Sequence, residues 1–230
     1  MTKEEVRKKA ILDIYEGNNL QELGFRYYKS KNYLERKRSD FSFIIGFNST
    51  KVNILDNTNI IIITASVSDD KFADWQKNRL GKYPSGLIGG GKIKNLMVAG
   101  PPYYDFDLTE NENTQQTVIK EISLEIKSSV FKFFELCIEI ERIIENINLP
   151  CFSAPTIIEY LAYKNCREKI SNIIDTKSKI YPELKTQIDY YSSYLSINSK
   201  PIGGFKETYE DNSKLLALQI AETLLRINNS

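Results

Sequence analysis

The apolar positions in the first part of the chain follow the pattern of β-strands. Every second residue from Phe41 to Phe47 is apolar, which predicts a half-buried strand. Ile60–Val67 is a mainly apolar run of strand length, so we expect a central strand buried on nearly both sides. Ahead of these strands, Thr2 and Glu5 have the spacing of a capping box, which predicts that a helix begins there.

In the second part of the chain, apolar residues recur at every third or fourth position. From Ile119 to Ile147 this spacing predicts one long amphipathic helix that ends before Pro150. Two later helices are predicted over Pro182–Ile197 and Ser213–Ile227.

The segment between these parts carries turn signals and short apolar runs. Ser68 is expected to cap a helix of about ten residues. The stretch Gly81–Gly91 is rich in glycine and proline and predicts a loop, and Ile93–Val98 and Tyr103–Leu108 predict strands.

Together these patterns predict an α+β fold, with an N-terminal antiparallel sheet and flanking helices followed by a helical C-terminal region. Residues 1–110 would form the sheet region and residues 111–230 the helical region, either as two domains or as one continuous domain. A chain of 230 residues with 41% hydrophobic content is long enough to bury a core without disulfides.

The composition contains no histidine. This excludes histidine-dependent metal sites and the nucleophilic relays in which imidazole is the base. Three cysteines, Cys137, Cys151 and Cys166, are too few and too widely spaced for a disulfide framework or a zinc ribbon, so free thiols are expected. We therefore predict no cofactor and no metal site, and a binding protein in preference to an enzyme.

The N-terminus is charged and lacks an apolar signal core, and no run reaches the ~18 apolar residues of a membrane span. The sequence thus predicts a cytoplasmic protein with no membrane partner. The net charge is +1, but residues 1–100 carry 17 Lys and Arg against 11 Asp and Glu. This excess indicates either a basic face for an anionic partner or two halves that attract each other.

Arg26–Arg38 contains six cations and one anion, with three tyrosines among them. On a hairpin, alternate side chains would present cations and rings on one face, a pattern typical of single-stranded nucleic-acid binding. The same pattern suits a charge-protected edge hairpin whose tyrosines belong to the core, or a contact with an acidic protein. The candidate binding residues are Arg26, Tyr28, Lys29, Tyr33, Arg36 and Arg38, with Lys92 from the glycine-rich stretch.

Gly86–Lys92 fits the first seven positions of a phosphate-binding loop. The eighth position is Ile93, which offers no hydroxyl for magnesium, and the residues that follow predict a strand where such a loop needs a helix. We therefore interpret this segment as a flexible loop that presents Lys92.

Glu125 and Lys127, with Asp105 and Asp107 upstream, have the acidic-x-lysine spacing of magnesium-dependent nucleases. In such enzymes the Glu and Lys lie on a strand, whereas here they fall in the predicted long helix. A magnesium-dependent hydrolase is a second alternative to protein binding.

A short helix ending in Leu23–Phe25, a basic hairpin over Tyr33–Arg38 and a helix with Trp75 precede the long helix that ends at Leu149–Pro150. In this order of elements, residues 18–150 resemble small uncharacterised bacterial domains of unknown function that open with Gly-Phe after the first helix. Some of those domains lie near polymorphic-toxin loci and are suspected immunity or accessory proteins. The resemblance implies a protein partner and brings no catalytic residues.

The leading hypothesis is therefore a non-enzymatic bacterial binding protein, immunity-like or defence-accessory-like, that acts through protein–protein interaction. The contact would be made by Arg26–Arg38 or by Gly81–Gly91. Nucleic-acid binding through Arg26–Arg38 is the first alternative. No pattern in the sequence indicates an oligomeric state.

Overall fold

The computed structural model shows that the chain forms two compact units. It describes residues 2–49, 59–81, 85–97, 106–108, 111–197 and 212–229. The first unit comprises Met1–Asp70, Gly89–Glu139 and Leu149–Cys151, and the second comprises Lys71–Ile88, Ile140–Asn148 and Phe152–Ser230. Each unit is assembled from separate stretches of chain, so this division does not coincide with a single boundary near residue 110.

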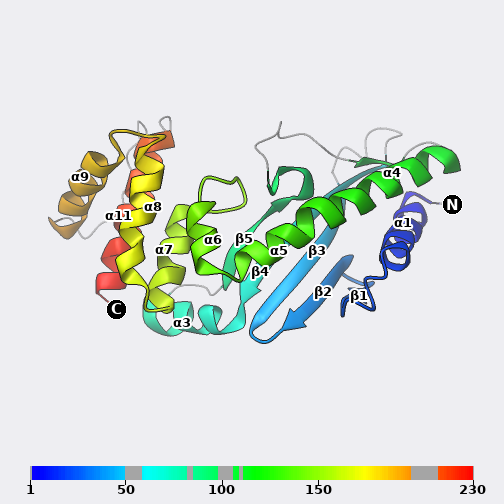
Figure 1. Ribbon diagram of the computed structural model, residues 1–230, viewed down its shortest axis with the longest axis horizontal. Coiled ribbons are helices and arrows are strands. Elements are labelled where there is room, and N and C mark those ends of the chain that lie inside the picture. Colours follow the sequence, from blue (N-terminus) through cyan, green and yellow to red (C-terminus); the bar gives the residue numbers. More distant parts are fainter. Residues whose placement is uncertain are drawn as a thin grey trace. The chain divides into compact units, whose positions relative to one another are not determined.

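The strands form a six-stranded sheet (Figure 1). They are β1 (Arg26–Tyr28), β2 (Tyr33–Arg38), β3 (Phe41–Ser49), β4 (Ile60–Asp69), β5 (Leu87–Lys92) and β6 (Phe106–Asp107). Their order is β1-β2-β3-β4-β5, and β6 also pairs with β4. The pairings from β1 to β4, and that of β4 with β6, are antiparallel, which confirms the predicted antiparallel sheet.

The strand register sorts side chains onto two faces of the sheet. On the inner face, Phe43 of β3 lies opposite Arg36 of β2 and Val67 of β4. Because side chains alternate along a strand, Ile44 and its partner Ser66 belong to the outer face, where both are half-buried. β4 therefore alternates between buried and half-buried residues and is not buried on both sides.

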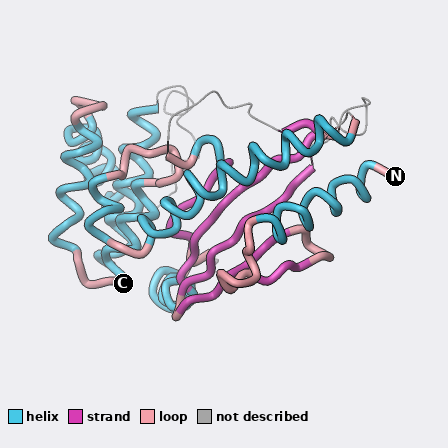
Figure 2. The backbone as a smooth tube through the Cα atoms, turned by 45° about the vertical axis from the view of Figure 1, so that its right-hand side comes forward, coloured by secondary structure: helices cyan, strands magenta, loops and turns pink. Residues whose placement is uncertain are grey.

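Helices of the first unit cover the inner face of the sheet (Figure 2). They are α1 (Lys3–Gly17), α4 (Glu112–Glu125), the π-helical segment η2 (Ile126–Val130) and α5 (Phe131–Cys137). α1 begins at the predicted capping box, where the backbone N–H of Glu5 donates to Thr2 Oγ1 at 3.2 Å. On α5, the Phe134 ring meets Phe43 edge to face with centroids 5.2 Å apart, which joins the long helix to the sheet core.

The second unit is helical. Among its described residues, the helices are α3 (Asp70–Leu80), α6 (Ile140–Glu145), α7 (Ala154–Tyr163), the 3₁₀ turn η3 (Arg167–Lys169), α8 (Ile170–Ser178), α9 (Leu184–Ile197) and α11 (Asn212–Asn228). α11 packs against α9 and α7 and buries Ala217, Ile220 and Ala221. The predicted α+β class, with its helical C-terminal region, is confirmed. Across the described ranges, no helix has the length and apolar character needed to cross a membrane.

Two predictions are wrong here: Leu87–Lys92, within the predicted loop Gly81–Gly91, is a strand, and Ile93–Asn95, at the start of the predicted strand Ile93–Val98, is a 3₁₀ turn (η1). Gly90 explains why the glycine-rich stretch can form a strand. A Cβ at Gly90 would lie 2.9 Å from both the Ala65 carbonyl oxygen and the Ser66 Cβ, so the missing side chain lets β5 approach β4 closely. Lys82–Pro84, Val98 and Tyr103–Asp105 lie outside the described residues.

The long helix is shorter than its apolar spacing predicts. Helical backbone runs without a break from Glu112 to Cys137, and α6 starts separately at Ile140. The interruption falls where the chain passes from the first compact unit to the second. No proline or glycine marks it, so the apolar pattern alone could not show where the helix ends.

Candidate binding surface of the hairpin

β1 and β2 form a hairpin at the edge of the sheet, since β1 is the first strand in the order. The turn is closed by the backbone N–H of Lys31, which donates to the Tyr28 carbonyl at 3.0 Å. Asn32 adopts a positive φ of 51°, and its carbonyl accepts a hydrogen bond from the Phe47 N–H at 2.9 Å. The first bond closes the turn within the hairpin, and the second joins the hairpin to β3 and helps to fix which side chains share a face.

Five hairpin residues share the outer face: Arg26, Tyr28, Tyr33, Glu35 and Lys37. Arg26 lies opposite Glu35, and Tyr28 lies opposite Tyr33. We call these five residues the hairpin face. Arg26, Tyr28 and Lys37 are exposed, while Tyr33 and Glu35 are half-buried.

The two tyrosines of the hairpin face stack on each other. The ring centroids of Tyr28 and Tyr33 are 4.8 Å apart, and the rings are inclined by 28°. A hydrogen bond between the Tyr28 hydroxyl and the Glu35 carboxylate raises the pKa of Tyr28. The ring contact with Tyr33 thus restrains the Tyr28 side chain before any partner binds, which reduces the conformational entropy that binding would cost.

A hollow of about 300 Å³ lies beside this tyrosine pair. It is lined by Gly24, Arg26, Tyr28, Glu35 and Lys37. Lys37 Nζ is 3.1 Å from Asp70 Oδ2, and this ion pair raises the pKa of Lys37. The hollow therefore combines cations, one carboxylate and an aromatic ring, a combination suited to a polar and aromatic contact.

Arg36 and Arg38 lie on the opposite face of the hairpin. The guanidinium carbon of Arg36 is 5.2 Å from the Phe25 ring centroid and 4.9 Å from that of Phe43. Desolvation by burial lowers the pKa of Arg36, with the nearby charge of Arg38 contributing in the same direction. Arg36 thus packs onto core rings, and only Arg38 of the two is exposed.

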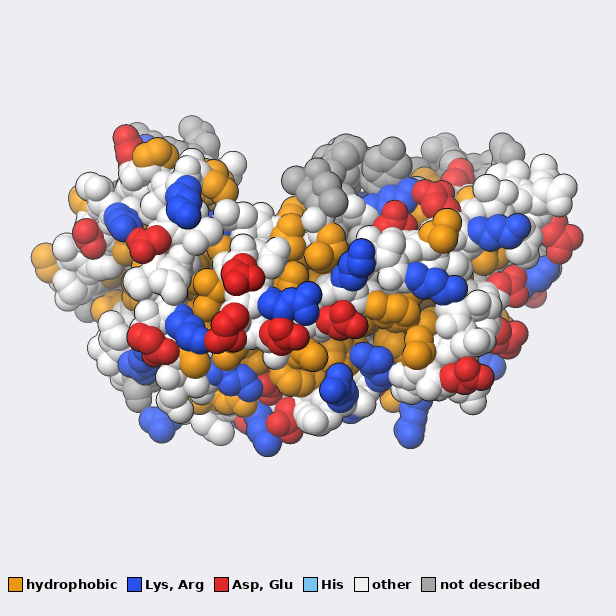
Figure 3. Space-filling model, viewed as in Figure 1, with side chains coloured by type: hydrophobic (Ala, Val, Ile, Leu, Met, Phe, Trp, Pro, Cys, Tyr) orange, Lys and Arg blue, Asp and Glu red, His pale blue; other side chains and the backbone are white. Residues whose placement is uncertain are grey.

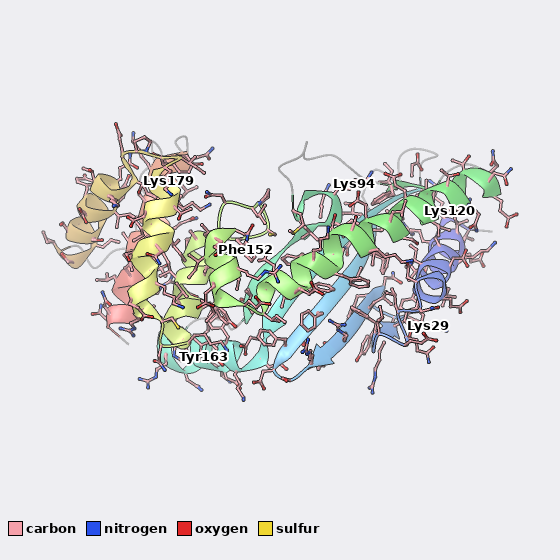
Figure 4. The ribbon with its side chains drawn as sticks, in the orientation of Figure 1. Lys29, Lys94, Lys120, Phe152, Tyr163 and Lys179 are labelled. Atoms are coloured by element: carbon pink, nitrogen blue, oxygen red, sulfur yellow. The ribbon has the colours of Figure 1, made fainter. Side chains whose placement is uncertain are left out.

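The structure therefore brings only part of the predicted binding set together. Arg26, Tyr28 and Tyr33 share the hairpin face, whereas Lys29 lies exposed in the turn (Figure 4). Lys92 ends β5, at the other end of the strand order from β1.

Glu35 and Lys37 belong to the hairpin face but are missing from the predicted set. They follow Tyr33 at two-residue steps along β2, and side chains at such steps share a face of a strand. Applying this alternation to the sequence would have added both residues to the predicted set.

The surface over the long helix is different in character. In Figure 3, basic and acidic side chains on this side of the first unit are intermixed with apolar ones. Lys94, for example, pairs with Glu121 of α4, and its ammonium lies 4.4 Å from the Phe106 ring centroid. Because positive and negative charges are intermixed and paired here, this surface has no extended electrostatic potential of a single sign.

Glu125 and Lys127 of the nuclease hypothesis lie on helical backbone. Glu125 ends α4 and accepts a hydrogen bond from Ser129 Oγ at 3.0 Å, and Lys127 lies in η2. Asp107 lies on β6, and Asp105 is outside the described residues. Within the described ranges, no group of three or more Cys, Asp or Glu side chains is arranged to hold a metal ion.

Comparison with known proteins identifies one distant relative. No protein-family profile matches the chain, and no solved structure matches it. A putative ankyrin repeat protein of Acanthamoeba polyphaga mimivirus is 22% identical to the chain over 169 residues, which is 72% of this chain and 33% of that protein. The chain thus spans about a third of the length of this relative.

Proposed function

We propose that this chain is a non-enzymatic protein-binding module, similar in role to bacterial immunity or defence-accessory proteins, and that it contacts an acidic partner through the hairpin face. The stacked Tyr28–Tyr33 pair beside the hollow is the observation that carries the proposal. Tyrosine and arginine dominate the energetics of protein interfaces, where they bury large contact areas around a polar rim. Here both residue types meet on an exposed sheet edge.

The charge of the hairpin indicates the chemistry of the partner. Arg26, Lys29, Lys31, Lys37 and Arg38 are exposed, and the same thirteen-residue segment contains one acidic residue, Glu35. An acidic protein surface would be steered toward this edge by long-range attraction. Glu35, on the hairpin face itself, would require a matching donor on the partner and so would contribute specificity.

The distant relative supports a binding role. Its name describes ankyrin repeats, and repeat proteins of that kind stack their units into extended binding surfaces. The similarity extends over a third of that protein, so it supports binding as a class of function and names no partner.

Two features favour a protein over a nucleic acid as the partner. The Tyr28 and Tyr33 rings stack on each other, so their facing surfaces are not open to an unstacked base. Arg36, which would be a strong phosphate ligand if exposed, packs on Phe25 and Phe43 instead.

The test is an affinity capture with the tagged full chain, from a lysate of the organism that encodes it, with and without nuclease treatment. Two variants change the hairpin face, Tyr28→Ala and Arg26→Glu. Two matched controls change exposed residues of the second unit, Tyr190→Ala and Lys179→Glu. Circular dichroism melts confirm that all four variants fold.

We expect a protein that the wild type and both controls retain, and that nuclease does not release. Both hairpin variants should weaken the affinity of the purified partner by at least about tenfold, because they remove central interface contacts. Equal capture by the hairpin variants and the controls would exclude this surface. Loss of capture after nuclease treatment would replace the proposal with nucleic-acid binding.

A further inference from the structure

A second cavity lies on the other side of the hairpin from the hairpin face. Its volume is about 370 Å³, and its lining residues are Lys8 and Leu12 of α1 with Tyr27, Lys29 and Ser30 of the hairpin. Tyr27 alternates with Arg26 and Tyr28 along β1, so its side chain belongs to the opposite face of the hairpin. This cavity is therefore separate from the hollow of the hairpin face.

The floor of this cavity is mainly apolar and is held in place by neighbouring contacts. Leu12 and Tyr27 are both half-buried. The Tyr15 ring lies 6.3 Å from that of Tyr27, and the Tyr15 hydroxyl donates a 2.9 Å hydrogen bond to the Phe25 carbonyl. An aliphatic chain placed on this floor would lose contact with water without displacing a polar group of the protein.

The rim of the cavity is positively charged. Lys8 and Lys29 contribute two exposed ammonium groups, and none of the five lining residues is acidic. Lys8 Nζ forms an exposed ion pair with Glu4 Oε1 at 2.7 Å on the same helix. Lys8 also acts on Tyr27, where its positive charge opposes the rise in the Tyr27 pKa that burial causes. Lys8 is one of the five residues that line the cavity, so its side chain borders it.

We propose that this cavity binds a small apolar carboxylate, with its hydrocarbon part on Leu12 and Tyr27 and its carboxylate between Lys8 and Lys29. A volume of about 370 Å³ falls within the range of small-molecule sites and holds a chain of roughly eight carbons. An apolar floor beneath a cationic rim matches an amphipathic anion better than it matches a sugar or a nucleotide, which would leave polar groups on the floor unpaired. The proposal does not depend on the protein-binding function proposed for the other face.

The test is a titration of the ¹⁵N-labelled full chain with octanoate, followed by amide chemical shifts. We expect a dissociation constant of about 1 mM, which is reasonable for a ligand of this size. The shifted amides should cluster at Leu12, Tyr27, Lys29 and Ser30. Octanamide, which has the same shape without the charge, should bind at least about fivefold more weakly.

Three variants examine the two parts of the site. Lys29→Gln should weaken octanoate binding by about two- to fivefold, because it removes one rim charge. Lys31→Gln is the matched control, since Lys31 is an exposed lysine of the same turn that does not line the cavity. Leu12→Asn should abolish binding by making the floor polar, and its amide spectrum shows whether the fold is retained.

Three results would overturn the proposal. They are no shifts at these amides up to about 10 mM octanoate, equal affinity for octanamide and octanoate, and equal weakening by Lys29→Gln and Lys31→Gln. Tyr28→Ala, which alters the hairpin face, should leave the octanoate titration unchanged. Failure of the carboxylate-binding proposal can therefore be distinguished from failure of the proposed protein binding through the hairpin face.

Discussion

The guanidinium carbon of Arg36 lies 4.9 Å from the ring centroid of Phe43, its cross-strand partner on β3. The Phe25 ring lies 5.2 Å from the same carbon. Among the described residues, Nε of Arg36 is buried without a hydrogen-bond partner. The sequence places Arg36 in a basic surface segment, but its side chain packs against two core rings and its charge is partly desolvated.

Arg36→Ala should lower the free energy of unfolding by about 2 kcal/mol, because it removes the side-chain stem and its contact with two rings. Arg36→Met should stay within about 1 kcal/mol of the wild type, since it keeps the stem and removes the unpaired Nε. Arg38→Ala, at an exposed position, should change stability by less than about 0.5 kcal/mol. Urea denaturation measures all three, and equal effects of Arg36→Ala and Arg38→Ala would contradict a packing role for Arg36.

Gly90→Ala should destabilise the protein by about 1–3 kcal/mol. Its new Cβ would lie 2.9 Å from the backbone oxygen of Ala65, which cannot move without disturbing β4. Gly91→Ala is the matched control, because there the nearest atom is Leu96 Cδ2 at 3.8 Å. Thermal melts of the two variants should differ clearly, and similar melting temperatures would mean that β5 adjusts its distance from β4 freely.

Gln76→Ala should destabilise the second unit by about 3 kcal/mol, because it removes a buried hydrogen bond to Glu159 and leaves the buried Gly86 N–H without its acceptor. Gln76 Nε2 donates to Glu159 Oε2 at 2.9 Å, and Gln76 Oε1 accepts from the backbone N–H groups of Ser85 at 3.2 Å and Gly86 at 3.0 Å. Lys77→Ala, at the exposed neighbouring position, serves as the control. Hydrogen exchange at Ser85 and Gly86 should become faster in Gln76→Ala, and unchanged protection at both amides would show that another group replaces the glutamine.

The buried thiols should react slowly in the folded protein. Desolvation by burial raises the pKa of Cys151 to about 12 and raises that of Cys137 as well, so little thiolate forms at pH 8. We expect a thiol reagent to modify the half-buried Cys166 first, and Cys137 and Cys151 only after unfolding. Peptide mapping after a short exposure identifies the modified residue, and early modification of Cys151 would show that the region opens readily.

The same pKa shifts predict how stability depends on pH. A thiol whose pKa is raised in the folded state contributes stability that is present below its ordinary pKa of 9.0 and is lost as the pH rises toward 12. Cys151→Ala should therefore lose less stability between pH 9 and about 11 than the wild type does. Parallel pH profiles for the two proteins would show that other groups account for the alkaline loss.

Much of the fold follows from local patterns. The period-two spacing at Phe43 and Ile45 predicts β3, and the capping box at Thr2 predicts the start of α1, because each depends on residues close together in the chain. The candidate binding surface was predicted less completely. The basic and aromatic composition of residues 26–38 pointed to the hairpin, but composition does not show which side chains share a face.

Local sequence thus specifies the α+β class, the main strands and helices, and the absence of histidine chemistry. Three features depend on contacts between distant segments. The register of β2 against β3 turns Arg36 toward Phe43 and leaves Tyr28 and Tyr33 on the outer face. β5, which contains Gly90, forms a strand because it can lie close to β4. The long helix ends after Cys137, near the point where the chain leaves the first compact unit. The reason is the same in each case, because periodicity records which side of an element is buried but does not record which neighbour buries it.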